Sequence, residues 1–340
     1  MPPLEENDSR PAVVTPGNYD GVHLGHRALI STARQVASDS EHAGLGGLRV
    51  VALSFDPHPL HFIAPDRAPP LLTDVPRRIE LLRAAGADEV VMQTFDRAFS
   101  LLSPSEFVEQ VLVQKLNARA LVVGTDFRFG AQRAGDVAML HALGAPHGIA
   151  ISTVAPVTLE GELVSSSHVR AALGRGEVER AARMLTRVHD LDRRVVMGHQ
   201  RGRTIGFPTA NLELDGLLAP ADGVYAVSVR IVEASGSSAR ERRVDVGADG
   251  SLPAASSTRY LGVANLGVRP TVHGGRSMEV HLLDFAGDLY GRTLRVGFVA
   301  RLRGETKFPD LAALRAQIAR DVEAGRAALQ ACDPRLLVWI

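Results

Sequence analysis

Cysteine and lysine are scarce in this chain. Cys332 is the only cysteine among 340 residues, so no disulfide can form within the chain, as is typical of proteins in a reducing compartment. Lys115 and Lys307 are the only lysines, and arginine supplies the other basic side chains. Because Lys plus Arg and Asp plus Glu each number 38, the formal net charge is zero. The composition therefore gives no general attraction to nucleic acid or to an anionic membrane.

Long apolar runs are also absent from the sequence. No stretch is long and apolar enough to cross a bilayer, and residues 1–12 are acidic and polar, unlike a signal peptide. Hydrophobic residues make up 45% and charged residues 22% of the chain, as in ordinary globular enzymes. We therefore expect a cytoplasmic protein of about two domains, with no nucleic-acid or membrane partner. The composition leaves a homo-oligomer open.

The first half of the chain alternates strand-like and helix-like segments. Apolar runs predict buried strands at 12–17, 48–55, 88–95, 118–124 and 149–156. Helical patterns lie between them, at 26–38, 77–86 and 104–116. This alternation predicts a parallel sheet flanked by helices. Ligands bind such sheets beyond the carboxyl ends of the strands, where the loops GNYDGVHLGH, SFDPHP and GTDFRFG are expected.

Near residue 187 the pattern changes to short strands separated by glycine and polar turns. These runs lie at 193–198, 223–232, 259–267, 278–285 and 293–302, and they predict an antiparallel sheet or a small barrel. Leu311, Leu314, Ile318 and Val322 have helical spacing, which predicts a closing helix with one buried face. Residues 233–258 are rich in Gly, Ser and Ala and predict a flexible loop. We place the domain boundary between residues 186 and 187.

Two histidines open the first predicted helix. His23 and His26 are three residues apart and share one helix face. The unpaired N–H groups of a helix N-terminus favour a phosphate as the ligand. Gly17, Gly21 and Gly25 permit close approach of the backbone, and Asp20 is suited to orient a polar group or a water. A lone H-x-x-H is more often a pair of solvated histidines, but the strand, glycine loop and helix order favours phosphate binding.

GNYDGVHLGH resembles the nucleotidylyltransferase signature, whose two histidines stabilise a triphosphate. The second element of that superfamily is a Ser/Thr-rich helix start followed by Arg, and SSSHVR at 165–170 is similar to it. The resemblance implies that Ser165, Ser166 and Arg170 bind ATP phosphates. Read alone, the three serines are a plain helix N-cap.

SFDPHP, LLTDVPRRIELL, GTDFRFG and QRAGDVAML narrow the resemblance to the bacterial bifunctional riboflavin kinase/FAD synthetases. The first module of that family adenylylates FMN on an α/β nucleotidylyltransferase fold with a Rossmann-like parallel sheet. The resemblance implies that His58 and Asp126 contact ATP, together with the glycine-loop residues. It also implies flavin contacts by Phe62, Phe127 and Phe129. Ordinary core packing is the alternative for these rings, and for Phe129 the two interpretations are equally good.

The second half contains a metal-ligand pattern. Thr209 and Asn211, in GRTIGFPTAN, are two apart, so on a strand their side chains share one face. A hydroxyl and an amide carbonyl are hard oxygen ligands that suit a Mg²⁺ ion holding ATP phosphates. Glu279, in MEVHLLDF, can accept the proton of an attacking alcohol. The plainer alternatives are a strand start after a proline and a solvated strand glutamate.

The second half also resembles the riboflavin kinase module of the same family, in PTAN, DGVYAV, YLGVANLGVRPTV, MEVHLLDF, DLYGR and RLRGETKF. The resemblance implies a six-stranded barrel with a terminal helix. It implies a flap over ATP that includes Gly198, Gly202 and Gly206. The sequence departs from the family at Tyr19, Ser167, His199 and Gly304. None of these departures removes a predicted site residue.

The sequence therefore predicts a two-domain enzyme that uses ATP and Mg²⁺. It would phosphorylate riboflavin to FMN, releasing ADP, and adenylylate FMN to FAD, releasing pyrophosphate. One alternative is a riboflavin kinase with a decayed first module, although His23, His26, Ser165 and Arg170 are all intact. Others are a nucleotidylyltransferase for a different acceptor and a non-catalytic flavin carrier, which would not need two motifs for ATP phosphates.

Overall fold

The computed structural model describes residues 10–42, 46–197, 206–214, 216–232, 258–268 and 275–338. The chain divides into two compact units, and each is described by itself. The first comprises Met1–Pro69 and Asp74–Val164, and the second comprises Pro70–Thr73 and Ser165–Ile340. Among the described residues, no helix combines the length and apolar character needed to span a membrane. Gly198, Gly202, His199 and nearly all of the predicted 233–258 loop lie outside the described residues.

The first unit is built on a five-stranded parallel sheet with the order β3-β2-β1-β4-β5. Its strands are β1 (Ala12–Pro16), β2 (Arg49–Asp56), β3 (Glu89–Thr94), β4 (Ala118–Gly124) and β5 (Ala150–Val154). All five match the predicted apolar runs, and the parallel sheet is confirmed. The chain moves from β1 outward to β3 and then returns to β4. The loop after β1 therefore lies at the switch point where α/β sheets bind ligands.

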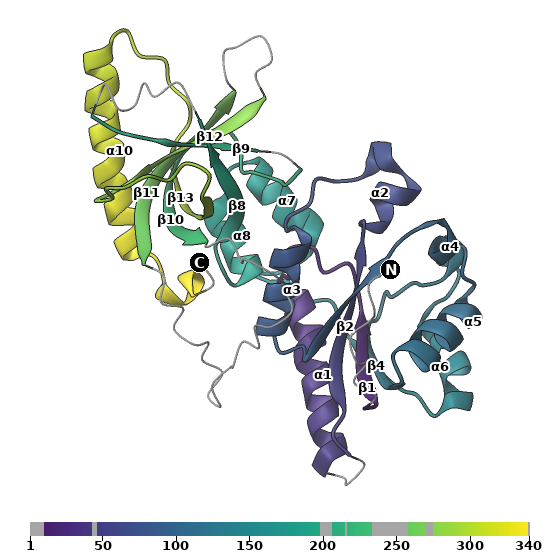
Figure 1. Cartoon of the computed structure of the whole chain (residues 1–340). Helices are drawn as coiled ribbons and strands as arrows, with labels where there is room; N and C mark the ends of the chain where they lie inside the picture. Colours follow the sequence, from purple (N-terminus) through teal and green to yellow (C-terminus); the bar gives the residue numbers. More distant parts are fainter. Residues whose placement is uncertain are drawn as a thin grey trace. The chain divides into compact units, whose positions relative to one another are not determined.

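Helices flank this sheet (Figure 1). They are α1 (Leu24–His42), α2 (Pro59–Ile63), α3 (Val75–Ala84), α4 (Arg97–Ser100), α5 (Pro104–Glu106) and α6 (Val137–Gly144), with a π-helix at Phe107–Lys115. Short 3-10 turns lie at Pro65–Arg67, Ala131–Arg133 and Ala145–His147, and β6 (Thr158–Leu159) pairs with β7 (Glu162–Leu163). One face of the sheet packs on the π-helix through Phe107, Val111 and Leu112. Ala33 and Ala37 of α1 pack on the other face, since both contact the cluster that contains Val13 and Val50.

The second unit is a closed six-stranded antiparallel barrel with the order β10-β11-β12-β9-β8-β13. The strands are β8 (His189–Val196), β9 (Ala210–Glu213), β10 (Gly223–Val232), β11 (Arg259–Val268), β12 (Arg276–Leu282) and β13 (Thr293–Arg303). Alternate side chains fill the interior: Leu212, Ala264, Leu266, Met278 and Val280 are 8% exposed or less. The six-stranded barrel expected from the resemblance is confirmed.

Helices α7 (Ser166–Gly174), α8 (Val178–Leu185) and α10 (Leu311–Ala331) belong to the second unit, with a 3-10 turn at Pro334–Leu337. The predicted closing helix is α10, which begins after Asp310, whose side chain accepts a hydrogen bond from the Ala313 N–H. Leu329 of α10 and Ala182 of α8 lie in one apolar cluster with Ala226 and Val299 of the barrel. The terminal helix therefore packs against the barrel wall, beside β10 and β13.

Candidate active sites

The loop that follows β1 is held by a buried tyrosine. Tyr19 has a positive φ of 53° and is 0% exposed. Its hydroxyl donates to the Thr15 carbonyl at 2.9 Å and lies 2.8 Å from the Thr15 Oγ1. Burial raises the pKa of the Tyr19 phenol, so it remains a neutral donor. A Cβ added to Gly17 would lie 3.1 Å from the Tyr19 ring, which explains why glycine suits that position.

His23 and His26 lie at the start of α1, as predicted. The His23 carbonyl accepts the first helical hydrogen bond, from the Arg27 N–H at 3.0 Å. The two imidazoles stack with centroids 3.7 Å apart and planes 18° apart. The Tyr19 ring lies 5.0 Å from that of His26. The loop and the helix start therefore bring the two rings together at the switch point of the sheet.

The electrostatic environment keeps His26 neutral. Burial lowers its pKa well below the ordinary value, and the charges of His23 and Arg78 lower it further. Among the described residues, the His26 Nδ1 has no hydrogen-bond partner. A neutral, desolvated imidazole beside a helix N-terminus can donate a hydrogen bond to an incoming phosphate, whose charge would in turn favour its protonation.

Arg78 is a site residue that sequence reasoning did not identify. It lies on α3, is 1% exposed, and its Nη1 donates to the Phe55 carbonyl at 3.1 Å. Burial lowers its pKa, while the carboxylates of Asp20, Asp56 and Asp74 raise it. Asp20 is itself 1% exposed. Arg78 therefore interacts electrostatically with both the glycine loop and the SFDPHP loop. The one feature of the sequence that could have pointed to Arg78 is its place in LLTDVPRRIELL, a segment that carries the family resemblance.

The SFDPHP loop ends in a capped helix. His58 is 6% exposed and its Nδ1 accepts a hydrogen bond from the Leu60 N–H at 3.2 Å, so its ring caps α2. Phe62 of α2 is 40% exposed and contacts Phe95 at a centroid distance of 6.1 Å. It therefore presents part of its ring to solvent.

The GTDFRFG loop contains the other two predicted aromatic residues. Phe127 stacks on Phe129 at 5.7 Å, with planes 12° apart. Phe129 is 6% exposed and packs on Phe107 of the π-helix, so its ring belongs to the core of the first unit. Asp126 is exposed. The phenyl ring that remains partly open on this loop is that of Phe127.

The serine motif starts α7 in the second unit. Ser165 is the N-cap residue, and its Oγ accepts a hydrogen bond from the His168 N–H at 3.3 Å. Ser166 is the first residue of the helix. The Arg170 Nε donates to the Pro70 carbonyl at 2.9 Å. The hydroxyl of Ser165 therefore serves the helix end, and the remaining N–H groups of the first turn are suited to an anion.

Two of the predicted kinase residues, Asn211 and Glu279, are neighbours on adjacent strands of the barrel. Asn211 of β9 is the direct cross-strand partner of Glu279 on β12, and such pairs place their side chains on one face about 5 Å apart. Glu279 is exposed while Met278 and Val280 on either side are 0% exposed, so this face is the outer one. Thr209 lies just before β9 and lines the pocket described next, together with Ala210 and Val280. His281 hydrogen-bonds the Pro208 carbonyl at 2.8 Å through Nδ1.

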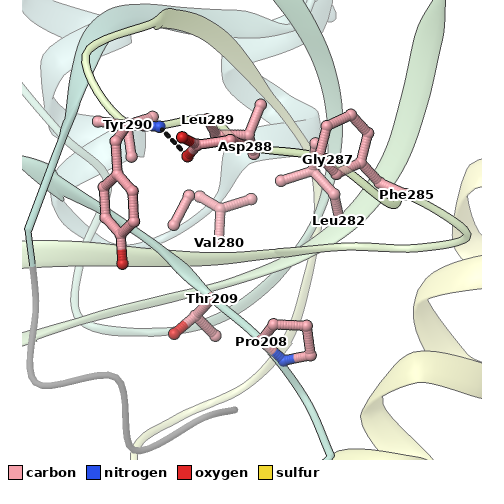
Figure 2. Close-up of a pocket in the computed structure, with 11 residues that line it drawn as sticks. Pro208, Thr209, Val280, Leu282, Phe285, Gly287, Asp288, Leu289 and Tyr290 are labelled. Carbon is pink, nitrogen blue, oxygen red and sulfur yellow. Dashed lines mark hydrogen bonds between the residues drawn. The ribbon is translucent and has the colours of Figure 1, made fainter.

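A pocket opens at the end of the barrel beside Thr209 (Figure 2). Its empty volume, including space open to solvent, is about 520 Å³. Strand residues Val195, Ala210, Val280 and Leu282 form an apolar wall, and Phe285 and residues 287–290 form the opposite side. The Asp288 carboxylate accepts a hydrogen bond from the Tyr290 N–H at 3.0 Å. The segment DLYGR begins at Asp288. It carries part of the family resemblance, but no site role was predicted for its residues. Gly206, in a turn with φ of 88°, is the flap glycine that the structure describes.

Comparisons with known proteins match both halves of the chain. A family model described as FAD synthetase matches residues 5–168, and one described as riboflavin kinase matches residues 185–329. The bifunctional riboflavin kinase/FMN adenylyltransferase of Escherichia coli K12 is 39% identical over 319 residues, covering 94% of this chain and 93% of the relative. The namesake from Pseudomonas fluorescens is 38% identical over 322 residues, covering 94% of each chain.

A solved structure also matches over nearly the whole chain. It is that of a protein named macrolide-efflux protein, from Streptococcus pneumoniae, which is 29% identical and has a TM-score of 0.78. The match covers 95% of this chain and 96% of that one. Identity to the bifunctional relatives extends across both units. The chain therefore belongs to the family of bifunctional riboflavin kinase/FMN adenylyltransferases.

Proposed function

We propose that the protein catalyses both reactions of its family, phosphorylating riboflavin to FMN and adenylylating FMN to FAD. ATP is the cosubstrate of enzymes of this family. The observation that carries the kinase assignment is the cross-strand pairing of Asn211 with Glu279, which joins a metal ligand to a general base. The stacked pair of His23 and His26 at the start of α1 supports the adenylyltransferase assignment. We place both activities in the cytoplasm, in agreement with the single cysteine.

In the kinase, Glu279 would accept the proton of the riboflavin 5′-hydroxyl as the hydroxyl oxygen attacks the γ-phosphorus and ADP leaves. A positioned general base contributes about 10²–10⁴-fold. Little covalent chemistry is needed from the protein, because positioning and charge neutralisation provide most of the acceleration. The exposed carboxylate of Glu279 on the outer face of the barrel is open to an incoming alcohol.

Thr209 and Asn211 would hold Mg²⁺. Within the described ranges, no cluster of three His, Cys, Asp or Glu side chains is suited to a metal. The hydroxyl and the amide are nevertheless hard oxygen donors two residues apart, and this donor set fits a Mg²⁺ ion completed by phosphates and water. When bound, the ion would neutralise charge on the transferred phosphate. The pocket beside Thr209 has the apolar wall that an adenine needs, and we assign it to ATP. A flap contact with ATP by Gly206 remains a prediction, as it does for Gly198 and Gly202, which lie outside the described residues.

In the adenylyltransferase, an FMN phosphate oxygen would attack the α-phosphorus of ATP, and pyrophosphate would leave. His23 and His26 would donate hydrogen bonds to the triphosphate, whose charge also suits the start of α1. Gly17 and Gly21 would allow the backbone to approach ATP, and Asp20, His58 and Asp126 would complete its contacts. We assign Ser165, Ser166 and Arg170 to phosphate binding from α7. Phe62 and Phe127 would form the flavin contacts, whereas Phe129, for which core packing was the alternative, would support Phe127 from the core.

A timed product assay tests the whole proposal. The protein is incubated with riboflavin, ATP and Mg²⁺, and FMN and FAD are quantified over time. Accumulation of FMN followed by FAD is the expected result. FMN without FAD would favour the alternative of a kinase with an inactive first unit, and flavin binding without any product would favour a carrier.

A further inference from the structure

Glu279 lies in the middle of a row of polar side chains that crosses three strands. In the barrel β12 lies between β9 and β11, and Glu279 pairs with Asn211 on one side and with Asn265 on the other. Directly opposite residues of antiparallel strands project from the same face with Cβ atoms about 5 Å apart. Asn211, Glu279 and Asn265 therefore form a continuous row on the outer face of the barrel.

Asn265 is an exposed position between two covered ones on its strand. Val263, two residues earlier on the same face, is 8% exposed and lies against α10, because a Cβ added to Gly325 would be 3.0 Å from the Val263 Cγ2. Gly267, two residues later, is buried beneath the carboxylate of Glu305, which occupies the space of a side chain. Asn265 between them is exposed. Within the described part of the chain, its amide makes no hydrogen bond to another side chain, so it can serve a ligand.

The two ends of the row differ in the ligands that they offer. The β9 end would offer the neutral oxygen ligands of Thr209 and Asn211, which suit a metal ion with phosphates. A carboxylate flanks each end, that of Glu213 two residues from Asn211 and that of Glu305 over Gly267, so charge does not distinguish the two ends. The proposed metal ligands assign the phosphates of ATP to the β9 side of Glu279, which leaves the β11 side to the acceptor alcohol.

We propose that Asn265 binds the ribityl chain of riboflavin through one of the two secondary hydroxyls nearest its phosphorylated end. This inference rests on the proposed kinase function. An amide both donates and accepts hydrogen bonds, as a hydroxyl does, and neighbouring strands are about 4.8 Å apart. One hydroxyl at Glu279 and a nearby one at Asn265 can thus be held together. Asn265 thereby fixes the direction of the acceptor, with its 5′-hydroxyl toward the γ-phosphate.

The test compares Asn265→Ala with wild type on riboflavin and on its 4′-deoxy and 3′-deoxy analogues. Asn265→Val, which suits a strand position, is a second variant without any hydrogen-bonding side-chain group. Arg259→Ala changes another exposed residue on the same strand and face and is the matched control. FAD formation from supplied FMN, measured in the same samples, checks that the rest of the protein is intact.

Both Asn265 variants should lower kcat/KM for riboflavin by about 5- to 10-fold, the usual effect of one neutral hydrogen bond. The loss should appear mainly in the KM for riboflavin, with the KM for ATP within about twofold, because the contact is present before and during transfer. For one of the two deoxy analogues the loss should nearly disappear. An equal loss of kcat/KM for riboflavin and both analogues, or an effect confined to the KM for ATP, would overturn the inference. Neither result would bear on the proposed kinase function, because the wild type would still form FMN. Absence of FMN formation by the wild type would instead refute the proposed function.

Discussion

The two candidate sites, both proposed to bind ATP, differ in how exposed their key side chains are. In the first unit, His23 and His26 are packed together at a helix start, and burial keeps His26 neutral. In the second unit, Glu279 is exposed on the outer face of a barrel, beside the amide of Asn211. Under the proposed function, the first site would hold hydrogen-bond donors for a triphosphate, and the second would keep its base exposed until the acceptor binds. Changes in the two sites should therefore have separable effects.

The largest effect is expected from Glu279→Gln. Glutamine keeps the shape of the side chain but cannot accept the ribityl proton, so kcat for FMN formation should fall about 10²-fold or more. Binding of riboflavin and ATP should change much less, because the lost interaction belongs mainly to the transition state. Steady-state and single-turnover assays of FMN formation measure this.

Glu213→Gln is the matched control for that variant. Glu213 is an exposed glutamate of β9, two residues from Asn211, and its replacement should leave FMN formation within about twofold, as for ordinary surface substitutions. FAD formation from supplied FMN should be unaffected in both variants. Wild-type rates for Glu279→Gln, with the chemical step rate-limiting, would remove Glu279 from the mechanism.

His26→Ala should have the converse effect. FAD formation should fall on the order of 10²-fold, the typical result of losing one donor to transition-state charge, and FMN formation should stay near the wild-type rate. His42→Ala, at the exposed far end of α1, is the control. Loss of FMN formation in a folded His26→Ala protein would contradict the assignment of the two activities to separate sites.

The division of the chain into an α/β half and a β-rich half could be predicted from the sequence because it rests on local patterns. Apolar runs and glycine loops predict the parallel sheet and place GNYDGVHLGH at its edge, and the family resemblance supplies the barrel. Arg78 and Asn265 were not predictable in the same way. An arginine on a helix is normally solvated, and it is the packing of α3 beneath the loops that buries Arg78. The role of Asn265 depends on strand register between segments that no periodicity connects.

Asn211→Ala tests the proposed Mg²⁺ site of the kinase. Loss of an oxygen ligand should raise the Mg²⁺ concentration needed for half-maximal FMN formation by at least about tenfold, since even partners of metal ligands commonly contribute that much. Asn211→Asp should also impair the kinase, because it adds a charge beside Glu279. The Mg²⁺ titration of FAD formation is the internal control and should not move. An unchanged titration of FMN formation would exclude Asn211 from the metal site.

The half-buried His26 also predicts a pH dependence of stability in the first unit. Because the folded-state pKa of His26 is depressed, the unfolded state binds more protons, and stability falls as the pH drops below about 6.5. The slope for one such group is at most about 1.4 kcal/mol per pH unit. Hydrogen exchange of the β1 amides between pH 8 and 5.5 should show this loss in wild type and a flatter profile in His26→Gln. Identical profiles would show that His26 does not titrate in this range.

The smallest effect is expected from Tyr19→Phe. This variant tests whether packing or hydrogen bonding by Tyr19 holds the loop that follows β1. The variant keeps the ring beside His26 but leaves the Thr15 carbonyl and hydroxyl without the Tyr19 hydroxyl, which should cost about 1 kcal/mol of stability. FAD formation should stay within about threefold of wild type, because no group that contacts ATP changes. Adding Thr15→Val, a residue suited to a buried strand, removes the unpaired Thr15 hydroxyl and should recover part of the lost stability. If the double variant is instead less stable than the sum of its parts, the pair does not act through the hydrogen bond between Tyr19 and Thr15. The loop would then depend on the fit of its rings alone.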